Sequence, residues 1–269
     1  EVIDMGYHSL LPIDQLWLLK NANSRESVFS VQFSKEEDQR NGHPAATSFH
    51  MSRGWSDMYP ELQFFKDFPE GPRKVATFVT DIPNRGFAGG AIITKNPPTK
   101  NWEVSERFHP MYGKFTASED LTVVGRTMGY RSIEVYRYAE VLLIYAEAKA
   151  ASGGFDATAL SALNQVKRRA AGLDPDTPNA AVDATSATVQ DIIDEKGWEL
   201  AAEHKRWFDL VRTETLESAI LKRDPTEQVP LVRQPGKAQY ISPIPAEAIA
   251  TSKLVQNPQG KFNKELNKY

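Results

Sequence analysis

The feature that most constrains the fold of this chain is a run of helical periodicity between Arg137 and Arg212. In its first part, apolar residues recur at positions i, i+3, i+4, i+7 and i+8, which places them on one face of an α-helix. These residues are Tyr138, Val141, Leu142, Tyr145 and Ala146. Gly153 and Gly154 then end the helix, since adjacent glycines favour a turn.

Two further helices follow the Gly-Gly turn. Asp156 can cap the second helix, and Gly172 stands where a helix-ending glycine belongs. Thr188 and Asp191 form a capping-box pattern that opens a third helix, whose apolar spacing continues to Val211. Two antiparallel helices followed by a third are typical of a tetratricopeptide-like array, in which each unit buries its apolar face against the next.

The chain before this run is irregular, with frequent prolines and glycines over residues 34–131. Val28–Phe33 alternates apolar and polar residues and predicts a half-buried strand. We expect a short helix at Tyr59–Phe68, and short strands that include Val75–Val79 and Lys114–Thr116. The expected fold class is mostly α: tetratricopeptide-like helix pairs with a large irregular loop-rich region and a few short strands.

Four segments are expected within one domain. Residues 1–33 would be the end of an upstream helical region plus a short strand, and residues 34–131 the loop-rich region. Residues 132–216 would hold the tetratricopeptide-like helices, and residues 217–269 a C-terminal tail that packs on them. The chain begins without an initiator methionine or an apolar leader, so we expect its start to be a cut inside a longer protein.

Composition excludes several classes of function. The formal net charge of -3 argues against nucleic acid as a partner, because nucleic-acid binding needs clustered Lys and Arg. The absence of cysteine excludes disulfides, thiol catalysis and cysteine-ligated zinc. The five histidines are scattered, and neither a P-loop nor a G-x-S-x-G motif occurs. We therefore predict no catalytic residue, metal ligand or cofactor.

Four blocks of sequence carry a resemblance to a known family. Arg137–Ala148 is similar to the helix "RYAEVLLIYAEA", and Ala159–Leu173 resembles the stretch "ALNxVRxRAGL". Glu195–Arg212 resembles "ERRWELxxEGxRWFDLVR", and Pro243–Pro258 resembles "PIPxxEI…QNPGY". These blocks, in this order, are typical of the C-terminal half of the SusD/RagB family of outer-membrane nutrient-binding lipoproteins.

A fifth stretch, Glu26–Phe33, fits the family strand "EiIFSIQF". Three positions depart from the family pattern. Gly197 replaces a long side chain, His204 stands where the family favours glycine, and Gln259 interrupts the usual ending. These departures affect local packing and leave the resemblance in place.

The resemblance implies a function as well as a fold. It implies a non-catalytic protein, lipid-anchored on the outer membrane upstream of this chain, that captures oligosaccharides or polysaccharides at the cell surface. The expected partner is a TonB-dependent transporter of the SusC type. The main alternative is a helical-repeat scaffold that binds peptides or protein partners.

Two tryptophans in the loop-rich region are candidates for the ligand site. Sugar rings stack on indole, while their hydroxyl groups need polar side chains nearby. Both tryptophans have such neighbours, and the candidate residues are Arg53, Trp55, Asp57, Tyr59, Asn101 and Trp102. The alternative is that each aromatic ring is buried under its own segment. His109 and Tyr112 are weaker candidates.

A set of charged residues repeats every three or four positions in the third helix: Glu195, Glu199, Glu203, Arg206, Asp209 and Arg212. Two carboxylates could form a glycosidase pair. Regular spacing on one helix favours the other interpretation, in which these residues form ion pairs along the helix and contacts between helices. Trp17, Trp198 and Trp207 are expected in the core.

Overall fold

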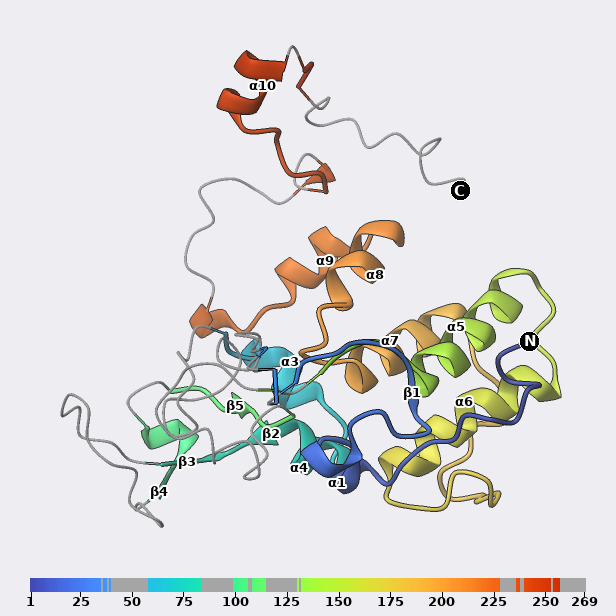
Figure 1. Cartoon of the computed structure of the whole chain (residues 1–269). Coiled ribbons are helices and arrows are strands. Elements are labelled where there is room, and N and C mark those ends of the chain that lie inside the picture. Colours follow the sequence, from blue (N-terminus) through green and yellow to red (C-terminus); the bar gives the residue numbers. More distant parts are fainter. Residues whose placement is uncertain are drawn as a thin grey trace. The chain divides into compact units, whose positions relative to one another are not determined.

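The computed structural model (Figure 1) describes residues 1–34, 36–37, 39, 58–83, 99–105, 108–114, 130, 132–227, 236–237, 240–252 and 254–256. These residues fall into two compact units. The first consists of Glu1–Pro60 and Asp67–Glu203, and the second of Glu61–Lys66 and His204–Tyr269. Helices dominate the secondary structure and the strands are short, which confirms the expected fold class.

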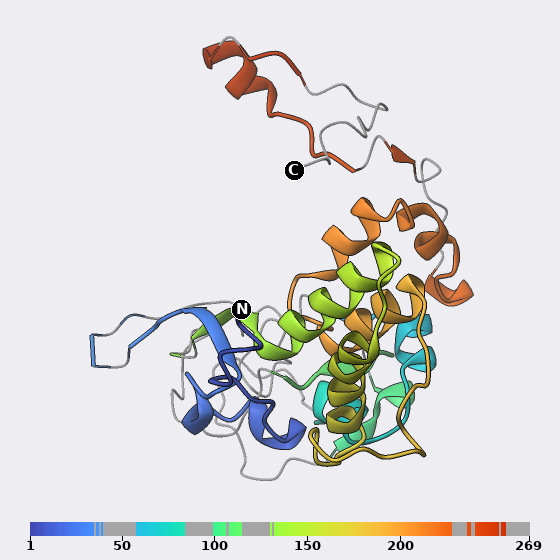
Figure 2. The ribbon, with the colours of Figure 1, turned by 90° about the vertical axis from the view of Figure 1, so that its right-hand side faces the viewer.

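Three helices form the core of the first unit: α5 (Tyr138–Ala151), α6 (Ala157–Ala170) and α7 (Val189–Glu199). They contact one another in pairs and lie side by side in both views (Figures 1 and 2). Their shared core is built by Tyr138, Ala139, Leu142, Leu143, Ala146, Ala162, Leu163, Val166 and Ile192. Burial of each larger apolar side chain stabilises the unit by about 1.5–3 kcal/mol.

The predicted helix ends are confirmed by their hydrogen bonds. The Asp156 carboxylate accepts from the backbone N–H groups of Thr158 and Ala159 at 3.0 and 2.9 Å. Gly172 has a φ of +75°, a backbone conformation that glycine adopts without strain. At the start of α7, the Thr188 side chain accepts from the Asp191 N–H, and the Asp191 carboxylate accepts from the Thr188 N–H.

The predicted third helix is two helices. α7 ends at Glu199, and α8 (Arg206–Arg212) begins after a turn. In this turn Ala202 and His204 have φ values of 66° and 60°, which an α-helix does not allow. The expectation of one continuous helix to Arg212 was therefore wrong, because periodicity carries no information about a turn that preserves the spacing of apolar residues.

Short antiparallel strands complete the first unit. β1 (Ser27–Val31) pairs with β6 (Ile133–Arg137), and this confirms the strand predicted at Val28–Phe33. Val28 packs against the core of α5–α7. β2 (Phe78–Val79) pairs with β5 (Met111–Tyr112), and β3 (Asp81–Pro83) pairs with β4 (Thr99–Asn101).

The first unit also contains short helices. α1 (Ile13–Leu16) and η1 (Leu19–Asn21) precede β1, whereas α4 (Pro72–Thr77) and η3 (Trp102–Val104) lie between strands in the sequence. The strand predicted at Val75–Val79 was mostly wrong, because α4 occupies these positions up to Thr77. Pro72 stands in the first turn of α4, where its fixed φ favours a helix. Of the strand expected at Lys114–Thr116, only Lys114 lies within the described residues, and it follows β5, which ends at Tyr112.

The second unit contains most of α3 (Leu62–Asp67), together with α8, α9 (Leu216–Leu221), η5 (Pro225–Glu227) and α10 (Ala246–Ser252). α3 confirms a shorter form of the helix predicted at Tyr59–Phe68. Tyr240 is buried and its hydroxyl donates to Glu217 of α9. α10 has no buried residue, so the packing of the tail on the helices of the array stays a prediction.

Candidate functional site

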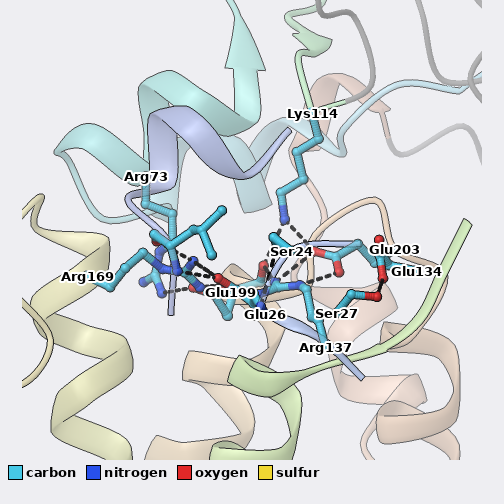
Figure 3. Close-up of polar contacts among 11 residues, drawn as sticks. Ser24, Glu26, Ser27, Arg73, Lys114, Glu134, Arg137, Arg169, Glu199 and Glu203 are labelled. Atoms are coloured by element: carbon cyan, nitrogen blue, oxygen red, sulfur yellow. Dashed lines mark hydrogen bonds and ion pairs between the residues drawn. The ribbon is translucent and has the colours of Figure 1, made fainter. Parts of the chain in front are cut away.

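Eight charged side chains gather inside the first unit, and their labelled members point toward one another around Glu199 (Figure 3). We call them the charge cluster: Glu26, Arg73, Lys114, Arg137, Arg169, Glu195, Glu199 and Glu203. Their side chains are between 0 and 6% exposed. Four cations face four carboxylates, so the formal charges cancel. Such balance is required, because an unpaired buried charge is strongly destabilising.

Glu199, near the C-terminus of α7, is the centre of the charge cluster. One carboxylate oxygen accepts from Arg169 and lies 2.7 Å from Nη1 of Arg137. The other accepts from Nη1 of Arg73 at 3.1 Å. Burial alone raises the pKa of a carboxyl group, but these three cations outweigh burial and hold the pKa of Glu199 well below its ordinary value.

Arg137, at the end of β6, contacts three of the carboxylate residues. Its Nε donates to Glu203 Oε2 at 2.7 Å, and its Nη1 donates to Glu26 Oε1 at 2.9 Å. Its Nη2 donates both to Glu203 Oε1 at 2.9 Å and to the backbone carbonyl of Glu199 at 2.7 Å. A planar guanidinium suits this arrangement, because it presents five donors in a fixed geometry.

Lys114 joins the charge cluster from the segment after β5. Its ammonium group donates to the Glu199 carbonyl at 2.7 Å and to Glu203 Oε1 at 2.8 Å. The same group lies 5.2 Å from the centroid of the Trp17 ring, within the range of a cation–π interaction. Burial lowers the pKa of Lys114 from its ordinary value, while Glu203 acts in the opposite direction.

The charge cluster corrects one part of the sequence interpretation. Glu195, Glu199 and Glu203 do not pair with residues of their own helix; they bind cations contributed by α4, α6, β6 and the end of β5. The expected contacts between helices are confirmed by the pair Arg169–Glu199 of α6 and α7. Arg212 and Asp209 do form an ion pair along α8. Both carboxyl groups of a glycosidase must reach the substrate, whereas Glu199 is fully buried and contacts three arginine side chains.

Sequence reasoning missed Glu26, Arg73, Lys114 and Arg169 as partners of these carboxylates. They come from four different segments of the chain, and up to 143 residues separate members that touch. A local pattern cannot reveal such pairs. One signal was available in the sequence. Several charged residues stand in segments whose apolar pattern places these segments in the core.

Three of the predicted ligand residues lie within the described part of the chain, while Arg53, Trp55 and Asp57 lie outside it. Asn101 ends β4, and its side chain accepts from the Glu103 N–H at 2.9 Å, which caps η3. Trp102 follows it and is half-buried, with its backbone N–H donating to the Thr80 carbonyl at 2.8 Å. Asn101 and Trp102 thus share one turn, whose residues 99–104 we call the Trp102 turn.

Tyr59 is half-buried, and its ring lies 5.3 Å from the ring of His109, centroid to centroid. Among the residues that the structure describes, the buried Tyr59 hydroxyl has no hydrogen-bond partner. His109 comes two residues before β5, so Tyr59 packs against the segment that leads into this strand. Tyr112, the other weak candidate, pairs with Phe78 in the β2–β5 ladder, where the two rings stack at 5.7 Å.

The described residues contain neither a metal-binding cluster nor a membrane-spanning helix. No group of three or more His, Cys, Asp or Glu side chains could hold a metal ion in this part of the chain. Within the same residues, every helix is too short or too polar to cross a bilayer.

A sequence profile described as the SusD family matches residues 84–259, which is more than half of the chain. The chain belongs to the SusD family. The match includes α5–α7, six of the eight residues of the charge cluster, and the Trp102 turn. No curated protein sequence matches this SusD-family chain.

Solved structures show the same fold. The surface glycan-binding protein A from Bacteroides fluxus is 24% identical with a TM-score of 0.69, over 96% of this chain and 56% of that protein. A SusD superfamily protein from Parabacteroides distasonis is 23% identical with a TM-score of 0.68, over 95% of this chain and 55% of that protein.

The surface glycan-binding protein A from Bacteroides thetaiotaomicron, solved in complex with laminarihexaose, is also similar. It is 18% identical with a TM-score of 0.66, over 95% of this chain and 57% of that protein. The SusD-family chain therefore spans a little over half of the length of each of these proteins.

Proposed function

We propose that this SusD-family protein binds glycans at the bacterial cell surface without cleaving them. The observation that carries the proposal is the family match over residues 84–259. The fold supports it, because similar structures include surface glycan-binding proteins, one of them in complex with laminarihexaose. The buried, ion-paired state of Glu199 and Glu203 also favours a structural role for the carboxylates that a glycosidase would otherwise need.

We further propose that the ligand binds in the loop-rich region, residues 34–131. Trp102 would offer an aromatic face to a sugar ring, and Asn101 beside it an amide for hydroxyl groups. Tyr59 would add a second aromatic ring. Arg53, Trp55 and Asp57 belong to the same proposal on the strength of their sequence alone.

Delivery of the glycan to a transporter is a separate part of the proposal. Membership of the SusD family supports a TonB-dependent transporter of the SusC type as the partner. It also supports a lipid anchor on the outer membrane, outside the present chain. Co-purification of the transporter with the protein from cell envelopes would test the partnership.

A panel of glycans tests the binding proposal. In affinity electrophoresis, at least one polysaccharide in the gel should retard the protein, and laminarihexaose is the first oligosaccharide to titrate in solution. A reducing-sugar assay on the same samples should show no product. If no glycan binds, whereas extended peptides do, the protein is a peptide-binding scaffold and the glycan proposal is wrong.

A further inference from the structure

Lys114 stands where the charge cluster meets the strands that lead to the proposed ligand residues. It follows β5 by two residues, and the intervening Gly113 donates its N–H to the Thr77 carbonyl at 2.7 Å. The Lys114 side chain is thus hydrogen-bonded to the Glu199 carbonyl of α7 and to the Glu203 carboxylate. The neighbouring Gly113 is hydrogen-bonded to the end of α4, directly before β2.

A continuous series of contacts links this point to the Trp102 turn. β5 pairs with β2, with Tyr112 opposite Phe78 and Met111 opposite Val79. Thr80 follows β2, and its carbonyl accepts the backbone N–H of Trp102 at 2.8 Å. The position of the Trp102 backbone thus depends on β2, and the position of β2 depends on β5.

The same strand also supports Tyr59. His109 lies two residues before β5, and its ring packs against the Tyr59 ring at 5.3 Å. Tyr59 and Trp102 are distant in sequence, yet β5 is connected to both. A displacement of β5 would change the position of both aromatic rings.

The bonds of Lys114 suit a positioning role better than a role in stability alone. Both of its acceptors, Glu203 Oε1 and the Glu199 carbonyl, also accept from Nη2 of Arg137. Removal of the ammonium group therefore leaves neither acceptor without a partner. What is lost is the directional attachment of the β5 segment to α7, which an apolar side chain cannot replace.

We propose that Lys114 is a positioning residue for the glycan site: its bonds to Glu199 and Glu203 fix β5, which places Trp102 and Tyr59. The inference rests on the proposed function, since it concerns the same site. The Lys114 side chain itself is buried and does not touch the ligand.

The test compares Lys114→Met with Lys196→Met in the complete protein. Lys196 serves as the control, because it is a buried lysine of α7 whose ammonium group pairs with Glu147 of α5 at 3.2 Å. Calorimetry should show that Lys114→Met weakens glycan binding about tenfold, whereas Lys196→Met leaves the affinity within about twofold. In a Trp102→Ala, Tyr59→Ala background, Lys114→Met should have no further effect on the affinity.

Gly113→Ala provides a second route if Lys114→Met does not fold. A Cβ atom at Gly113 would lie 3.3 Å from Val79 Cγ2 and 3.4 Å from the Ala76 carbonyl oxygen, so β5 must shift slightly against β2. This variant should also weaken binding. An affinity of Lys114→Met or Gly113→Ala equal to that of the wild type overturns the inference, and so does an equal loss in Lys196→Met. Absence of any binding by the wild type overturns the proposed function instead.

Discussion

The charge cluster and the Trp102 turn are built in opposite ways, although both belong to the first unit. The charge cluster joins side chains that are far apart in the sequence, and it is buried throughout. The Trp102 turn combines a local cap, which Asn101 provides for the residues that follow it, with pairing to strands that are only two or three residues long. Changes in the charge cluster should therefore appear as lost stability, with the proposed effect of Lys114 on affinity as the exception, and changes in the turn as lost affinity.

Arg137→Met should have the largest effect, because it leaves Glu26, Glu199 and Glu203 short of their shared cation. We expect the free energy of unfolding to fall by about 4 kcal/mol, the typical effect of breaking a buried ion pair from one side. Chemical denaturation followed by circular dichroism measures it.

Arg212→Met is the matched control for Arg137→Met. Arg212 is 38% exposed, and it forms an ion pair with Asp209, three residues earlier in α8. The loss should be below about 1 kcal/mol, as for other exposed pairs. Equal losses in the two variants would show that the charge cluster does not hold the first unit together.

Acid should destabilise the first unit through the charge cluster. The folded-state pKa values of Glu199 and Glu203 lie below the ordinary value of 4.5, because the surrounding cations outweigh burial. Their contribution to stability is therefore complete above about pH 4.5 and is lost as the pH falls below that value. Each unit of pKa depression corresponds to about 1.4 kcal/mol.

Denaturation midpoints measured between pH 7 and pH 3 test this pH dependence. They should change little down to about pH 5 and then fall. In Glu203→Gln the fall should be shallower, since one of the two titrating groups is gone. A midpoint that is constant down to pH 3 contradicts a stabilising role for the ionised carboxylates.

His204→Gly should have the smallest effect on stability. It should raise the free energy of unfolding, whereas Arg137→Met and Arg212→Met lower it. His204 has a φ of 60°, a left-handed conformation that costs side chains with a Cβ about 1 kcal/mol. Glycine adopts it freely but also gains freedom in the unfolded chain, so we expect a net stabilisation of about 0.5 kcal/mol. Thermal unfolding measures it, and His204→Ala, which keeps the strain, should show no gain.

The helices of the first unit were predictable because their signals are local. The apolar spacing of α5, the Asp156 cap, Gly172 and the Thr188–Asp191 capping box each act within a few residues. The break between α7 and α8 was not predictable, since Ala202 and His204 are not typical turn residues. The family pattern has glycine at the position of His204, and the left-handed φ at this position explains that preference.

The sequence predicts which residue types form the proposed ligand site, but it does not predict how these residues are arranged in space. Asn101 and Trp102 are adjacent in the sequence, so their proximity in space needs no tertiary contact. The connection of Trp102 to β2 and of Tyr59 to His109 depends on tertiary pairing across strands of two residues, which are too short to show a periodic pattern. For the same reason, the sequence alone could not predict the role that we propose for Lys114.

The affinity of Trp102→Ala for the glycan that binds the wild type tests the central claim most directly. The matched control is Trp207→Ala. The expectation that Trp207 lies in the core was wrong, because this residue of α8 is 47% exposed, and it lies in the second unit. Isothermal titration calorimetry should give about a tenfold higher Kd for Trp102→Ala, or about 1.4 kcal/mol, with an unchanged free energy of unfolding. Trp207→Ala should bind as the wild type does. Wild-type affinity in Trp102→Ala would contradict the assignment of the ligand site to the Trp102 turn.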